Sequence, residues 1–195
     1  MKTLILAGFL GAGKTTVLME LAGYLVHCGE QVVILENEIS SAGVDNQLLK
    51  SKGFQVRNIF AGCVCCTSTG VLCQDVRKIE QEYDPSWLII EATGMAYPDS
   101  IRDSLKEELG MDASVLTLVD AKRWKRVLNG LRQFIISQLR GASAVLVTKI
   151  DTVPEVTVSE VIESVREISG PIPIHPICAI KPQQQAFWET ITGEI

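Results

Sequence analysis

The chain has 195 residues, of which 47% are hydrophobic and 21% are charged, and its formal net charge at pH 7 is -5. This length suits one packed domain, and this composition excludes a fibrous or disordered chain. The acidic balance, with scattered lysines and arginines, provides no basic surface for nucleic acid. We therefore expect a single globular domain over residues 1–195 that does not bind nucleic acid.

Short apolar runs alternate with longer segments of helical periodicity, which is typical of a mostly parallel sheet covered by helices on both faces. Strands are predicted at 4–7, 32–36, 56–60, 87–91, 115–120, 144–149 and 174–178. Helices are predicted at 15–26, 69–83, 124–139 and about 158–168. The predicted fold class is α/β, with three layers and a sheet of about seven strands.

The first predicted strand lies in "MKTLILAGFLGAG", which is similar to a secretory signal because a lysine precedes an apolar run and small residues. The stretch continues directly into the phosphate-binding motif described next, which cleavage would destroy. No other apolar run approaches the roughly 20 residues that span a bilayer. We therefore expect a cytoplasmic protein without a membrane partner.

The stretch "GFLGAGKTT" fits the pattern G-x-x-x-x-G-K-[ST] with Gly8, Gly13, Lys14 and Thr15. Because it lies between a predicted strand and a predicted helix, it predicts a P-loop, whose glycines turn successive N–H groups toward a phosphate. Lys14 is expected to contact the terminal phosphates, and the Thr15 hydroxyl to bind Mg²⁺. The other nucleotide-binding residues predicted in this P-loop NTPase motif are Gly11, Ala12 and Thr16.

The stretch "AGCVCC" places Cys63, Cys65 and Cys66 within four positions. A disulfide does not fit a reducing compartment, and a structural zinc site commonly uses two separated cysteine pairs, of which the second is missing. Burial in the core stays an alternative, since free cysteine is often a core residue. We favour an open thiolate site for Zn²⁺, Co²⁺ or Ni²⁺ that a residue from elsewhere completes.

The completing ligand is predicted to be a carboxylate, Glu36 or Glu38, at the end of the second predicted strand, since parallel strand ends converge near a bound nucleotide. Cys73 is a poorer candidate because it falls on the apolar face of its predicted helix. No role is assigned to the remaining cysteines and histidines, which are Cys28, Cys178, His27 and His175.

The stretch "WLIIEATG" is an apolar strand that ends in Glu91, with Gly94 three residues later. A carboxylate beside the P-loop can hold a Mg²⁺-bound water or orient the attacking water, and a glycine amide can sense the γ-phosphate. A solvated acidic residue at a strand end is the simpler alternative. The order of the motifs favours the catalytic role.

The stretch "TKID", formed by Thr148, Lys149, Ile150 and Asp151, departs by one residue from the N-K-x-D pattern with which GTPases recognise guanine. The Asp151 carboxylate can accept hydrogen bonds from the ring N–H and the exocyclic amine of guanine, whereas adenine leaves it unpaired. Thr148 replaces the usual asparagine, at the cost of side-chain hydrogen bonds. The stretch therefore predicts GTP rather than ATP as the nucleotide.

The stretches "GFLGAGKTT", "ILENE" followed by "GVD", "GCVCC", "IIEATGMAYPD", "LVDA" and "TKID" occur here in the order found in CobW-type GTPases. These proteins are relatives of the nickel-insertion GTPases of urease and hydrogenase maturation. The chain resembles this family as far as about Ala179. The resemblance implies a GTPase that binds GTP or GDP, Mg²⁺ and a transition metal. It further implies delivery of the metal, or of a cobalamin-related cofactor, to a client metalloprotein or corrinoid protein.

The sequence departs from this family at three points. The C-terminal domain that is usual in the family is absent from residues 1–195, and Ser40 and Ser41 replace a glycine and an acidic residue of a switch loop. No histidine-rich tail is present, which argues against metal storage.

We expect the cysteine loop and the loop of residues 36–45 to respond together to the γ-phosphate, so that GTP and metal binding are coupled. A homodimer that depends on nucleotide or metal stays open.

Lys14 and Glu91 are the predicted catalytic residues. No glutamine or arginine near the motifs stands out as a built-in accelerator, so slow intrinsic hydrolysis is expected. Two alternatives remain. One is a P-loop ATPase or kinase that acts on a small molecule, and the other is a non-enzymatic nucleotide- and metal-binding regulatory module.

Overall fold

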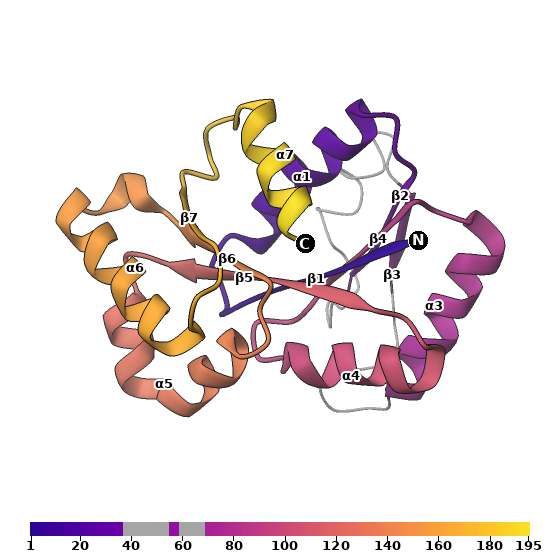
Figure 1. Ribbon diagram of the computed structural model, residues 1–195, viewed down its shortest axis with the longest axis horizontal. Helices are drawn as coiled ribbons and strands as arrows, with labels where there is room; N and C mark the ends of the chain where they lie inside the picture. Colours follow the sequence, from indigo (N-terminus) through magenta and orange to yellow (C-terminus); the bar gives the residue numbers. More distant parts are fainter. Residues whose placement is uncertain (37–54, 59–68) are drawn as a thin grey trace.

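The computed structural model describes residues 1–36, 55–58 and 69–195. Its centre is a seven-stranded sheet in the order β3-β2-β4-β1-β5-β6-β7, and every neighbouring pair is parallel (Figure 1). The strands are β1 Lys2–Gly8, β2 Val32–Glu36, β3 Gln55–Asn58, β4 Trp87–Glu91, β5 Ala113–Asp120, β6 Ala144–Thr148 and β7 Ile174–Ile177. All seven predicted strands are therefore present, and the predicted end of the third lies outside the described residues.

Helices cover both faces of the sheet. They are α1 Lys14–His27, α3 Thr69–Tyr83, α4 Pro98–Leu109, α5 Trp124–Leu139, α6 Glu155–Ser169 and α7 Gln185–Glu194, with a short 3-10 helix η1 at Ile150–Thr152. In Figure 1, α1 and α7 lie on one face, and α3, α4, α5 and α6 lie on the other. The described helices include the four predicted ones as well as α4 and α7, which the sequence analysis missed. None of them is both long and apolar enough to cross a bilayer.

Helix α5 is not the continuous helix that the periodicity predicted. The backbone of Leu131 has φ -136° and ψ 37°, which interrupts the helix and bends it. Gly130 precedes this residue, and glycine weakens a helix interior because it has the most backbone freedom to lose. The predicted apolar stripe of this helix is confirmed at Trp124, Ile135 and Leu139, which are buried, but Leu131, at the kink, is 38% exposed.

The central strand β1 lies in the core and leads directly into the first motif. Its residues from Thr3 to Gly8 are all buried. Leu4 and Leu6 pack in the cluster with α1 and α7, whereas Ile5 and Ala7 pack in the cluster with α3 and α4. A strand covered on both faces needs such a continuous apolar run. The turn that follows Gly8 is therefore anchored in the middle of the core.

Candidate nucleotide-binding site

The turn between β1 and α1 has the backbone of a phosphate cradle. Gly13 stands at the N-cap of α1 with φ 95°, and no side chain caps the helix. The N–H of Ala12 donates to the carbonyl of Phe9 at 3.0 Å, which tightens the loop. An uncapped helix N-terminus presents free N–H groups and the positive end of the helix dipole. The loop is thus suited to bind an anion.

Gly8 is confined by its neighbour as well as by its own backbone. Its φ is 137°, and a Cβ added there would lie 2.5 Å from the carbonyl oxygen of Leu118. We expect Gly8→Ala to lower the free energy of unfolding by about 2 kcal/mol or more, from backbone strain and overpacking. Urea titration checks this, with Gly23→Ala as control, because a Cβ on this α1 residue meets nothing within 4 Å. Equal stability of the two variants would contradict the prediction.

Lys14 and Thr15, at the start of α1, face the end of β4. The Lys14 side chain is buried and its Nζ donates to the carbonyl of Gly8 at 3.0 Å. Burial lowers the pKa of Lys14, and the charge of Glu91 offsets part of this effect. The Thr15 hydroxyl donates to Oε1 of Glu91 at 3.1 Å. The fold thus brings together the predicted phosphate-binding lysine, the predicted Mg²⁺-binding hydroxyl and the predicted catalytic carboxylate.

The loop after β4 packs directly on the P-loop. A Cβ added at Gly94 would lie 2.6 Å from the backbone nitrogen of Leu10, so only glycine allows this approach. The Gln138 amide of α5 donates to the carbonyls of Gly94 at 3.3 Å and Ala96 at 3.2 Å. Gln138 is buried. It therefore ties the predicted γ-phosphate sensor to the core.

The end of β6 meets the P-loop from the other side. The Thr148 hydroxyl lies 2.7 Å from the carbonyl of Ala12 and 3.2 Å from that of Val119, and Thr148 is buried. Lys149 has φ 58°, and its Nζ donates to the carbonyl of Gly11 at 2.7 Å. Thr148 was expected to lose side-chain hydrogen bonds relative to asparagine, yet it still holds the P-loop backbone.

Asp151 lies in η1, directly after this contact, and is exposed. Its Oδ1 accepts a hydrogen bond from the Cys178 thiol at 3.3 Å. Burial, followed by the neighbouring Asp151 carboxylate, raises the pKa of Cys178, so the thiol stays protonated and can donate. Thr16 is also exposed on the first turn of α1. The predicted base-recognition and phosphate-binding residues thus lie at one edge of the sheet.

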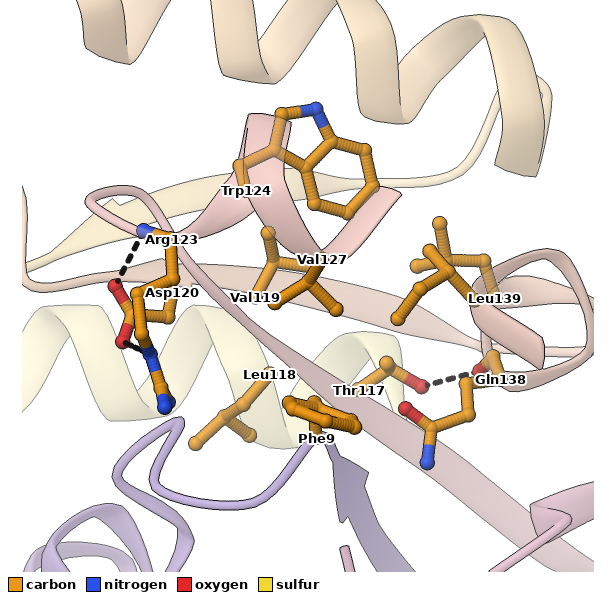
Figure 2. A pocket seen from close by; sticks show the side chains of 11 residues that line it. Phe9, Thr117, Leu118, Val119, Asp120, Arg123, Trp124, Val127, Gln138 and Leu139 are labelled. Atoms are coloured by element: carbon orange, nitrogen blue, oxygen red, sulfur yellow. Dashed lines mark hydrogen bonds and ion pairs between the residues drawn. The ribbon is translucent and has the colours of Figure 1, made fainter. Parts of the chain in front are cut away.

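The sequence analysis assigned no role to Asp120 at the end of β5 or to Arg123, which directly precedes α5. Asp120 is buried at the end of β5, and Arg123 precedes α5, where its Nη2 donates to the carbonyl of Leu10 at 2.6 Å. The expectation that no arginine or glutamine is a built-in accelerator stays a prediction, but the fold brings Arg123 and Gln138 beside the motifs. Both residues line the same small cavity as Phe9, which has room for about one water at about 20 Å³ (Figure 2). The LVDA stretch pointed to Asp120, but nothing in the sequence connected Arg123 to Leu10.

The predicted transition-metal ligands Cys63, Cys65 and Cys66 lie outside the described residues, as does the alternative ligand Glu38. For Glu36 the structure describes the backbone alone, which pairs with Glu91 in the register of β2 and β4. Glu36 therefore lies at the sheet edge that the sequence analysis expected. Within residues 1–36, 55–58 and 69–195, no cluster of three metal-ligating side chains occurs.

The cysteines of the described part behave as packing or surface residues. Cys73 is buried, and burial raises the pKa of its thiol to about 11, which disfavours the thiolate that a metal needs. Cys28 is exposed, and His175 pairs with Glu194 at 2.8 Å. The position of Cys73 agrees with the interpretation of this residue as part of the core.

A family model described as the CobW/HypB/UreG nucleotide-binding domain matches residues 2–176. The chain belongs to this family. The zinc chaperone YjiA of Escherichia coli (strain K12) is 31% identical over 186 residues, which cover 89% of this chain and 56% of YjiA. The zinc-regulated GTPase metalloprotein activator 1 of Schizosaccharomyces pombe is 27% identical over 180 residues, which cover 85% of this chain and 43% of that protein. The chain thus spans about half the length of these relatives.

The fold of the CobW/HypB/UreG domain is also found in a distant solved structure. HypB from Helicobacter pylori in complex with nickel superposes with a TM-score of 0.72 at 19% identity, covering 100% of this chain and 86% of HypB. At this identity the likeness shows the fold alone. The three-layer P-loop fold expected from the sequence is therefore confirmed.

Proposed function

We propose that this CobW/HypB/UreG domain binds and hydrolyses GTP and couples this cycle to delivery of a transition metal to a client protein. The observation that carries the proposal is the Thr15–Glu91 contact of 3.1 Å beside the buried Lys14. It brings a hydroxyl, a carboxylate and an ammonium to the mouth of an anion-binding turn. Family membership, and relatives named as zinc chaperones, favour zinc over cobalt, nickel or a cobalamin-related cargo.

The arrangement supports phosphoryl transfer to water. Water attacks the γ-phosphorus while the bond to the β–γ bridging oxygen breaks, and negative charge moves onto the GDP leaving group. The Lys14 ammonium and the loop N–H groups stabilise that charge. The Thr15 hydroxyl, an oxygen donor beside the Glu91 carboxylate, would hold Mg²⁺, which would neutralise the β- and γ-phosphates. Glu91 orients the attacking water.

The base is recognised at the edge formed by the T-K-I-D stretch. Asp151 is exposed there and accepts from the weakly acidic Cys178 thiol, a bond that guanine N–H groups can replace. This supports GTP over ATP, and it separates the proposal from a small-molecule ATPase or kinase. Detectable GTP hydrolysis by the wild-type chain separates it from a non-enzymatic regulatory module.

Asp151→Asn is expected to weaken GTP binding by about 10- to 100-fold and to leave ATP binding unchanged, because an amide repels one of the two guanine donors. Titration of both nucleotides by calorimetry measures the ratio. Asp112→Asn is the control, since this exposed carboxylate pairs with Lys106 before β5, away from the P-loop. A GTP-to-ATP preference that survives Asp151→Asn would argue against base recognition here.

A protein partner is supported by exposed apolar side chains next to the site. Leu10 of the P-loop is 69% exposed, Met95 is 53% exposed and Tyr97 is 49% exposed. Leu10 packs on Gly94, so these residues share the side of the site where the γ-phosphate would lie. Exposed apolar groups at such a place suit a client, or a second copy of the chain that binds with nucleotide or metal.

A further inference from the structure

Three successive peptide carbonyls of the P-loop accept hydrogen bonds from side chains outside it. Arg123 Nη2 donates to Leu10 at 2.6 Å, and Lys149 Nζ donates to Gly11 at 2.7 Å. The Thr148 hydroxyl lies 2.7 Å from the carbonyl of Ala12. Lys149 and Thr148 belong to the T-K-I-D stretch, whereas Arg123 comes from the start of α5. The role of Arg123 is not explained by any motif.

A planar trans peptide points its N–H opposite to its C=O. Fixing the Leu10 carbonyl toward Arg123 therefore directs the N–H of Gly11 away from Arg123 and into the loop. The N–H of Ala12 is already used by the carbonyl of Phe9 at 3.0 Å. The Gly11 N–H is therefore a candidate donor to a nucleotide phosphate, and the Arg123 bond to the Leu10 carbonyl fixes its direction.

Asp120 holds Arg123 in place. Its Oδ2 accepts from Arg123 Nε at 2.7 Å and from Lys149 Nζ at 2.8 Å (Figure 2 shows the bond to Arg123). Its Oδ1 accepts from the backbone N–H groups of Lys122 at 3.0 Å and Arg123 at 3.2 Å. Burial raises the pKa of Asp120, but the hydrogen bonds and charges of Lys149 and Arg123 outweigh burial and leave it below its usual range. The carboxylate is therefore ionised at neutral pH.

Arg123 also covers the outside of the loop. A Cβ added at Gly11 would lie 2.9 Å from Arg123 Nη2, so the guanidinium lies against the Gly11 backbone. The guanidinium of Arg123 donates hydrogen bonds in two directions, from Nε to the Asp120 carboxylate and from Nη2 to the carbonyl of Leu10. A lysine has a single charged nitrogen and cannot reproduce this planar bridge.

We propose that Arg123, anchored by Asp120, is a positioning residue for the nucleotide phosphates, because it orients the Leu10–Gly11 peptide for phosphate binding. This inference rests on the proposed binding of GTP and GDP. It assigns to Arg123 an effect on affinity for both nucleotides rather than a direct contact with the γ-phosphate during hydrolysis.

The test compares Kd for GDP and for a non-hydrolysable GTP analogue, and kcat at saturating GTP, in the full chain and in Arg123→Ala. Losing one charge-assisted hydrogen bond that orients a phosphate donor should raise both Kd values about tenfold, with little change in kcat. Arg123→Lys should recover the affinity only in part. The ³¹P resonances of bound GDP should shift in Arg123→Ala, a change that a merely structural role at this distance would not produce.

Arg126→Ala is the matched control, because Arg126 lies in the first turn of α5, directly after Arg123, and is exposed. It removes the same charge, so a general electrostatic effect would appear in both variants. Asp120→Asn is a second test and should also raise both Kd values. It removes the charged partner of Arg123 but keeps the size of the side chain at position 120.

Unchanged Kd values in Arg123→Ala would overturn the inference. A large fall in kcat at unchanged Kd would also overturn it, because that pattern belongs to an arginine that acts on the transition state. If the wild-type chain bound neither nucleotide, the proposed function itself would fail. If the wild-type chain binds the nucleotides and Arg123→Ala binds them with the same Kd, only this inference is rejected.

Discussion

Lys14→Met lowers kcat for GTP hydrolysis by about 100- to 1000-fold if the P-loop works as proposed, since removing a charge that stabilises the transition state has effects of this size. The Lys14 ammonium lies buried against the carbonyl of Gly8, inside the turn that receives the phosphates. Steady-state release of inorganic phosphate measures the rate. Lys122→Ala is the control, because this exposed lysine follows the end of β5 and its removal changes the charge equally.

Lys14→Met should lower activity, but it should not lower the thermal stability of the chain without nucleotide. Burial lowers the pKa of Lys14, which means that the folded state disfavours the charged form that predominates at pH 7 in the unfolded chain. In the absence of nucleotide, Lys14→Met should therefore unfold at a temperature equal to or above that of the wild type. Thermal unfolding without GTP checks this. Lower stability together with lost activity would point to a structural role for Lys14 and would contradict the assignment.

The triple variant Cys63→Ala, Cys65→Ala, Cys66→Ala is expected to lose about one equivalent of bound Zn²⁺ or Co²⁺. We propose that these thiols, with Glu36, form the open metal site, because soft or borderline ions bind thiolates well and the cluster precedes β4, which ends in Glu91. Metal stoichiometry after dialysis measures the loss. Guanine-nucleotide affinity measured without added metal should be unchanged, since the P-loop does not include these residues.

The double variant Cys28→Ala, Cys178→Ala is the matched control for the cysteine cluster. Both thiols lie in the described part of the chain, and neither belongs to a cluster of metal-ligating side chains there. We expect this variant to keep its full metal content. Full occupancy of the triple variant would instead mean that the three thiols take no part in binding.

Local sequence signals were sufficient to predict the strands, the P-loop turn and the position of Glu91 beside it. Strands β1, β4, β5 and β6 are largely buried apolar runs. The P-loop, Glu91 and the T-K-I-D stretch lie at the carboxyl ends of three of them, where parallel strands meet at one edge. The register confirms this convergence for Glu36 and Glu91. In these cases the chemistry of a residue and its place at a strand end were both visible in a few neighbouring letters.

Contacts between distant segments could not be predicted in the same way. Arg123 reaches Leu10 across 113 positions, and Gln138 reaches Gly94 across 44. Both depend on how α5 packs on the sheet, which periodicity does not report. One feature of the sequence did indicate a special role for Gln138, because this polar residue stands next to Leu139 in the apolar pattern of α5.

Helices α4 and α7, which the sequence analysis missed, have weak apolar periodicity. In α4 the buried residues are Pro98, Ile101 and Leu105, and in α7 they are Trp188 and Ile191. Two or three buried positions give too few repeats to distinguish a helix from a loop. Pro98 at the helix start was an available signal, because proline favours the first turn.

The coupling of metal and nucleotide is the central claim, and one titration tests it most directly. The affinity of the chain for Zn²⁺ should be measured with GDP and with a non-hydrolysable GTP analogue bound in turn. We expect the two affinities to differ by about 5- to 150-fold, and the metal must shift the affinity for the analogue by the same factor. Equal Zn²⁺ affinities in the two nucleotide states would contradict the account.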